Sequence, residues 1–244
     1  MRAAKWLWGT SWPLYAATVL LSNVIGALAI MLFIRFLIPM PEVRSFRADV
    51  PHLEVIGLGY LAFAVIVGIV ATLMLFRPVL DWQRHPDQHD PNMVRNLVMR
   101  IPVYQALVCL VVWAIGIAIA VAVAASSSGR LAVVIGLATS LAGMIVVLLT
   151  YLEAERLVRP VAAEALARRF EDSTLEPPIT QRLRLTWVMT TAVPVFGILL
   201  LAMAQRAGFF MGNAGELIPG IVALSVTALV TGFVGTTFAI MSVV

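Results

Sequence analysis

Residues 103–125 read VYQALVCLVVWAIGIAIAVAVAA, an unbroken apolar stretch with no Asp, Glu, Lys or Arg. At a rise of 1.5 Å per residue, an α-helix of this length reaches about 35 Å. The hydrocarbon core of a bilayer is about 30 Å thick, and roughly 20 apolar residues are enough to cross it. The stretch therefore predicts a membrane-spanning helix.

Five further runs along the chain have the same character. The whole chain is 61% hydrophobic and 12% charged, whereas soluble domains average about 25% charged residues. Helices satisfy their own backbone hydrogen bonds inside hydrocarbon, and the runs are longer than the ten-residue alternating segments of a barrel. We predict an all-α polytopic membrane protein with six transmembrane helices in one domain, residues 1–244. The predicted spans are residues 14–38, 55–76, 103–125, 131–152, 185–204 and 217–244.

The distribution of basic residues predicts the orientation. Twelve of the 17 Lys and Arg residues fall on one side of these spans, in the N-terminal segment and in loops 77–102 and 153–184, and five fall on the other. Cytoplasmic loops carry the excess of basic residues. The prediction is an N-in/C-in protein of the bacterial plasma membrane. The first span is too long for a cleaved signal sequence and is expected to remain as an anchor.

The two basic loops are expected to be partly helical. Residues 151–170 have the pattern of a helix that leaves the membrane, with Glu155 and Arg159 spaced to form an ion pair and with a kink or restart at Pro160. Arg77-Pro78-Val79 and Arg159-Pro160-Val161 occupy matching positions after the second and fourth spans. This match fits either an internal duplication or a generic stop at a membrane exit.

A few residues are candidates for binding or helix packing. Arg35 is a charge inside an apolar run, so it either snorkels to the outer interface or contacts an anionic lipid or ligand. Cys109 is interpreted as a small packing or lipid-facing residue. Small residues on the fourth and sixth spans predict close helix contacts, within the chain or in a dimer. They are Gly136, Ser140, Gly143, Gly232 and Gly235.

The sequence contains no pattern typical of an active site. It has no phosphate-binding glycine loop and no nucleophile paired with a base, and we predict no catalytic, cofactor or metal residue. Residues 85–91, HPDQHDP, are interpreted as a proline-stiffened turn, with a metal site as the alternative. Acidic residues are expected only at span ends, which argues against coupled transport. The basic residues follow membrane ends, so nucleic acid is not an expected partner.

Four segments together resemble a known family. They are Phe76-Arg77-Pro78-Val79 with Trp82, residues 90–102 (DPNMVRNLVMRIP), residues 154–166 (AERLVRPVAAEAL), and residues 182–187 (RLRLTW) before Val193-Pro194. The chain resembles the membrane portion of actinobacterial class III adenylate cyclases, which have six transmembrane helices and a HAMP linker. The resemblance implies a homodimeric membrane anchor and sensor. It would signal through its sixth helix to a cytoplasmic cyclase domain that converts ATP to cyclic AMP.

The chain departs from that family in lacking the HAMP linker and the catalytic domain. The sequence after Glu216 carries no charge up to Val244, which suggests an interrupted output helix and a fragmentary chain. Besides the bilayer, the expected partners are a second copy, the cyclase domain and a hydrophobic ligand. The alternatives are a standalone transporter or channel, or an accessory membrane protein.

Overall fold

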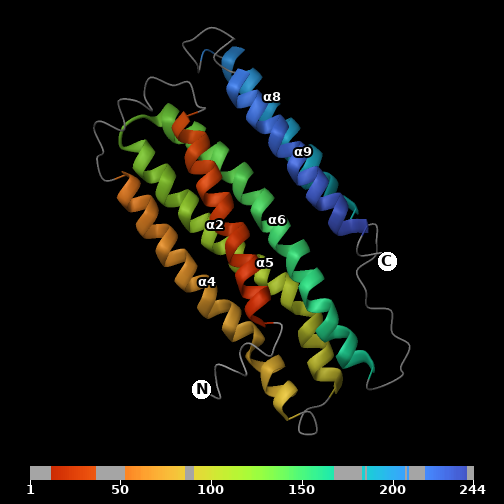
Figure 1. Ribbon diagram of the computed structural model, residues 1–244. Coiled ribbons are helices and arrows are strands. Elements are labelled where there is room, and N and C mark those ends of the chain that lie inside the picture. Colours follow the sequence, from red (N-terminus) through yellow and green to blue (C-terminus); the bar gives the residue numbers. More distant parts are fainter. Residues whose placement is uncertain are drawn as a thin grey trace.

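The computed structural model describes residues 12–36, 53–85, 91–167, 183–184, 186–206, 208 and 218–240. Every regular element in this part of the chain is helical, as the sequence predicted (Figure 1). Four of these helices are long and apolar enough to cross a membrane. They are α2 (Trp12–Phe36), α4 (Leu53–Arg84), α5 (Pro91–Ala125) and α6 (Gly129–Ala167).

Two shorter apolar helices follow, and they correspond to the fifth and sixth predicted spans. Residues 188–192 form a π-helical turn, η2 (Val188–Ala192), which leads directly into α8 (Val193–Arg206). Pro194 lies two residues after the end of this turn, and its ring would clash with the carbonyl of residue 190 in a regular α-helix. The wider π-turn avoids that clash. The last helix is α9 (Ile218–Ile240).

The long helices extend well past the predicted membrane spans. Helix α4 continues through Pro78 to Arg84, and α5 begins at Pro91 with Pro102 inside it. Helix α6 runs without interruption through Pro160, so the expected restart there is wrong. The predicted ion pair between Glu155 and Arg159 is confirmed at 3.9 Å. Both Arg-Pro pairs of the suggested duplication therefore lie inside continuing helices.

Helices α2, α4, α5 and α6 form one bundle, and α8 and α9 lie alongside it (Figure 1). Helices α5 and α6 make the most extensive contact and run antiparallel, because a short turn at residues 126–128 joins them. The backbone N–H groups of Ser127 and Ser128 donate to the carbonyl of Ala124 and close this turn. Helix α2 packs against both α6 and α4.

Each end of the bundle has its own apolar core. At one end, which we call the Trp82 end, Tyr15, Trp82, Val98 and Val158 bring the start of α2 together with the extended parts of α4, α5 and α6. At the other end, which we call the Arg35 end, side chains from five helices surround Ala124 and Leu131. The extended helical segments are thus packed against one another.

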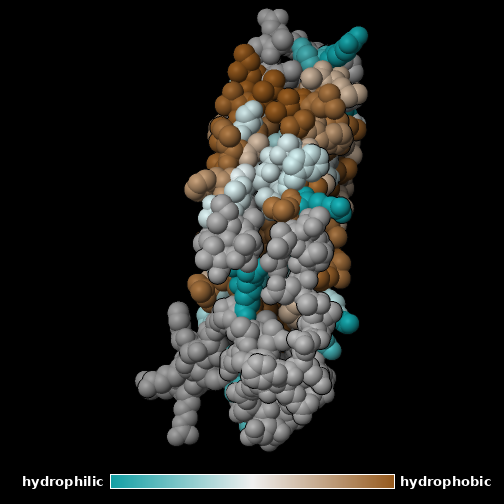
Figure 2. Space-filling view, turned by 90° about the vertical axis from the view of Figure 1, so that its right-hand side faces the viewer, coloured by the Kyte–Doolittle hydropathy of each residue, from teal (hydrophilic) through white to brown (hydrophobic). Residues whose placement is uncertain are grey.

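The outer surface is apolar along most of its described length. Leu229 and Phe233 of α9 are both 75% exposed, and many other leucines and valines are at least half exposed. Figure 2 views the molecule from the side of α8 and α9, where hydrophobic residues dominate the upper part and hydrophilic ones mark the upper edge. Exposed apolar surface of this extent fits a lipid environment and would be a liability in water.

Candidate functional site

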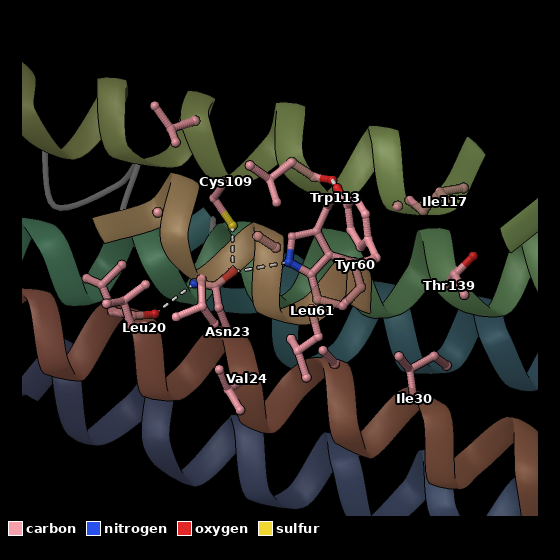
Figure 3. Close-up of a pocket in the computed structure, with 18 of the residues that line it drawn as sticks. Leu20, Asn23, Val24, Ile30, Tyr60, Leu61, Cys109, Trp113, Ile117 and Thr139 are labelled. Atoms are coloured by element: carbon pink, nitrogen blue, oxygen red, sulfur yellow. Dashed lines mark hydrogen bonds between the residues drawn. The ribbon is translucent and has the colours of Figure 1, made fainter. Parts of the chain in front are cut away.

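A network of polar side chains centred on Asn23 lies inside the bundle (Figure 3). The Asn23 Oδ1 atom accepts hydrogen bonds from Cys109 Sγ (3.0 Å) and Trp113 Nε1 (3.1 Å) of α5. Its Nδ2 atom donates to Thr150 Oγ1 of α6 (3.0 Å) and to the Val19 carbonyl (2.8 Å). A carboxamide offers two donors and two acceptor lone pairs. Asn23 therefore uses its full capacity, and it links three helices.

The network has an acidic member one helical turn beyond Thr150. Glu153 of α6 is 7% exposed, and its Oε2 atom accepts a hydrogen bond of 2.8 Å from the Ser22 hydroxyl of α2. The buried Tyr15 lies within electrostatic range of this carboxyl group, and its hydroxyl has no hydrogen-bond partner among the described residues. Glu153 thus sits between α2 and α6 with a neutral partner, in surroundings that disfavour a bare charge.

A second pair of polar side chains joins α4 to α5. Thr72 and Gln105 are 0% and 3% exposed, and the Thr72 hydroxyl donates to Gln105 Oε1 (3.2 Å). The Tyr60 hydroxyl of α4 donates to the Val112 carbonyl of α5. With the Asn23 network, these bonds tie all four long helices together through buried and half-buried side chains.

The Asn23 network borders a cavity of about 190 Å³ between α2, α4 and α5. Figure 3 shows Asn23, Cys109, Trp113 and Tyr60 on its walls, with apolar side chains such as Leu61 and Ile117 around them. Drug-sized ligands occupy pockets of about 300–1,000 Å³, so this cavity is smaller than a typical ligand site. It can take a small apolar group, or it can give the bundle room to repack.

Two residues of the network depart from the sequence interpretation. Cys109 is 6% exposed and hydrogen-bonded, so its lipid-facing interpretation is wrong and its packing interpretation holds. Glu153, which was expected at a span end, is buried in the bundle and lies within α6, which continues to Ala167. The sequence did carry a signal for it, because Glu153 follows Thr150 by three residues and so shares its helix face.

The candidate ligand contact Arg35 lies in the last turn of α2. It is exposed, and its guanidinium carbon is 5.3 Å from the centre of the Phe36 ring. It marks one end of the bundle and lies away from the Asn23 network. The structure therefore does not bring these two candidate sites together.

The candidate packing residues have different surroundings. A Cβ atom at Gly143 would meet the Trp113 ring at 2.9 Å, and one at Gly136 would meet Val121 at 3.0 Å, both on α5. A Cβ atom at Gly232 would have Thr190 as its nearest neighbour, at 3.8 Å. Ser140 is exposed. Gly235 is in α9, but its surroundings lie outside the described residues.

The described residues contain no group of three or more His, Cys, Asp or Glu side chains that could hold a metal ion. Of the segment 85–91, His85 is exposed after the end of α4, and residues 86–90 lie outside the described part. The arrangement at Asn23 offers hydrogen bonding and packing.

Comparison with known proteins finds relatives in mycobacteria. The chain is 27% identical over 221 residues to uncharacterized protein Rv1319c of Mycobacterium tuberculosis, a match that covers 88% of this chain and 40% of the relative. Uncharacterized protein Rv1318c of the same organism is 26% identical, with 88% and 39% covered. Uncharacterized protein Mb1354c of Mycobacterium bovis is 25% identical, with 88% and 38% covered. No protein-family model and no solved structure matches the chain.

The chain spans about two-fifths of the length of these curated relatives. The match takes in nearly all of this chain, so the relatives contain a segment similar to this helical bundle. More than half of each relative lies outside the match.

Proposed function

We propose that the chain is the membrane anchor and sensor module of a larger signalling protein in the bacterial plasma membrane. In this proposal the module has six spans with both termini in the cytoplasm. It works as a homodimer and passes a membrane signal through α9 to a cytoplasmic adenylate cyclase domain, by way of a HAMP linker. The resemblance in the basic loops supports the cyclase assignment.

The observation that carries the proposal is the packing of the long helices at the Trp82 end. Helices α4, α5 and α6 continue past the predicted membrane spans and form a core with the start of α2. Rigid helices that cross a membrane and remain packed beyond it can carry a displacement from one side to the other. The additional length of the mycobacterial relatives also fits a module that works with another domain.

Signalling through such a bundle requires two arrangements of the helices. A ligand shifts the equilibrium between them only by the difference in its affinity for the two. The hydrogen bonds of Asn23 hold α2 in one position relative to α5 and α6, and the adjoining cavity leaves space for another. A hydrophobic ligand from the bilayer is the class of signal that fits the apolar surface.

Fusion of residues 1–244 to a cyclase catalytic domain tests the proposal by cyclic AMP production in membranes. We expect the fusion with Asn23→Leu to differ severalfold from the unchanged fusion, because the position of α2 is no longer fixed. Ser225→Ala is the matched control, since the Ser225 hydroxyl bonds only its own helix at the Ile221 carbonyl. Equal cyclic AMP production by fusions that carry the module, its Asn23→Leu variant or an unrelated membrane anchor would mean that the module is only a passive anchor.

A second candidate, a transporter or channel, gains support from Glu153. Coupled transporters use ionisable side chains buried among their helices, and Glu153 is such a side chain. Substrate-dependent or proton flux in proteoliposomes that is lost in Glu153→Gln would favour this candidate over the sensor. Equal flux in protein-free liposomes would remove it.

A further inference from the structure

A second, larger hollow lies between the bundle and the α8–α9 pair. It measures about 520 Å³, and its walls come from α2 and α6 on one side and from α8 and α9 on the other. We call it the α8–α9 groove. Among the described residues that line it, Thr227 is the one with a polar side chain, and its hydroxyl donates to the Ala223 carbonyl of its own helix. With no polar group free to hold water, an apolar space of this kind stays dry.

The dimensions of the groove match a lipid chain. Its volume falls within the range of about 300–1,000 Å³ typical of ligand pockets, whereas the cavity beside Asn23 does not. Along α6 the groove extends from Val134 to Val146, which at 1.5 Å per residue is about 18 Å. That length is close to half of the 30 Å hydrocarbon core. The groove therefore has the reach of one acyl chain in one leaflet.

Positive charge gathers at one end of the groove. Arg35 adjoins Phe36, which lines the groove at the end of α2. Arg130 comes four residues before Val134 on α6, and Arg206 comes two residues after Ala204 at the end of α8. Arg130 donates to the Gly208 carbonyl, so the start of α6 lies against the segment after α8. The first turns of α6 and α9 contain no acidic residue.

We propose that the α8–α9 groove binds one anionic phospholipid of the membrane. Its acyl chain lies between α6 and the α8–α9 pair, and its phosphate lies among Arg35, Arg130 and Arg206. Arginine suits this role because its planar guanidinium matches phosphate oxygens and stays charged. In the proposed sensor, this lipid contacts α9 directly and so affects the position of the output helix. The binding itself does not depend on any cyclase output.

Native mass spectrometry of the full chain, purified from vesicles of phosphatidylglycerol and phosphatidylcholine, tests the proposal. We expect one phosphatidylglycerol to remain bound. Leu200→Trp should abolish this retention, because Leu200 lines the groove. Leu199→Trp is the matched control, since the neighbouring Leu199 is 52% exposed and lines no part of it. Circular dichroism of both variants establishes that they fold alike.

The headgroup assignment has its own test. An arginine near an anionic lipid surface is worth about 1 kcal/mol, which is about fivefold in affinity. Arg35→Gln and Arg206→Gln should each lower the preference for phosphatidylglycerol over phosphatidylcholine by about fivefold without emptying the groove. Equal retention of the two lipids by the unchanged chain, or equal retention by the Leu199→Trp and Leu200→Trp variants, would overturn the proposal. A fusion that does not signal would leave these binding results unaffected.

Discussion

The bundle of α2, α4, α5 and α6 and the pair of α8 and α9 are equally apolar outside but are held together differently. In the bundle, side chains such as the half-buried Asn23 and the buried Thr72 form hydrogen bonds from one helix to another. In α9, the hydroxyls of Ser225, Thr227 and Thr231 turn back onto carbonyls of their own helix. The contact of the pair with α6 encloses an apolar groove.

This difference indicates which helices have a fixed position and which can shift. A hydrogen bond between helices has a defined partner and a defined direction, so a displacement of one turn would break it. Apolar packing in lipid has no comparable direction, because lipid tails are as apolar as leucine side chains. The bundle therefore changes register only when bonds such as those of Asn23 break, whereas the α8–α9 pair can tilt or slide at a lower cost.

Replacing Asn23 by Leu is expected to have the largest effect on the bundle. The change removes three hydrogen bonds to other helices, and such bonds average about 0.6 kcal/mol in membrane proteins. We predict a loss of about 2 kcal/mol in the free energy of unfolding. Titration with a denaturing detergent in mixed micelles, followed by circular dichroism, measures it.

The Ser225→Ala variant sharpens the comparison under the same conditions. Its hydroxyl bonds to the Ile221 carbonyl within α9, so we expect no measurable change. If both variants unfolded alike, hydrogen bonds between helices would not distinguish the bundle from the pair.

Gly143→Ala should have a smaller effect, of about 1 kcal/mol. The new Cβ atom would meet the Trp113 ring at 2.9 Å, and the Trp113 indole is held by its bond to Asn23. The ring must shift, and overpacking of this kind destabilises a protein. Gly59→Ala is the control, because no atom lies within 4 Å of a Cβ atom there. Thermal unfolding of both variants in one detergent gives the difference, and equal melting temperatures would contradict the tight crossing of α5 and α6.

The helical class and the four long helices were predictable because apolar run length decides them. The ends of these helices were not predictable, because the prediction placed them at proline and arginine residues. Pro78, Pro102 and Pro160 look like helix boundaries, yet each lies within a helix. Neighbouring helices pack against these segments at the Trp82 end, and that packing compensates for the lost backbone hydrogen bonds.

The candidate site was predictable only in part. Asn23 and Ser22 are ordinary polar residues within the apolar run of α2, and nothing local indicates that they meet α5 and α6. Their partners are 86 to 131 positions away in the sequence, so only the packing of the helices reveals the network. Gly143 was singled out for close helix contact, whereas Asn23, around which that contact is organised, was not.

Two substitutions of Glu153, one of them with little expected effect, separate charge from hydrogen bonding. Its carboxyl group accepts from Ser22, and the carbonyl of a glutamine can accept the same bond. A buried charge facing a neutral hydroxyl is costly, so Glu153→Gln should leave the free energy of unfolding unchanged or raise it by up to about 1 kcal/mol. Glu153→Leu should lower it by about 1 kcal/mol, because the bond from α2 to α6 is lost and the Ser22 hydroxyl keeps only the Val19 carbonyl of its own helix. The same detergent titration measures both. A loss in Glu153→Gln as large as that in Glu153→Leu would mean that the negative charge itself holds α2 against α6, because both variants remove the charge and only the leucine also removes the acceptor for Ser22. The bundle would then depend on an ionised group, and its contrast with the α8–α9 pair would be one of charge and not of hydrogen-bond direction.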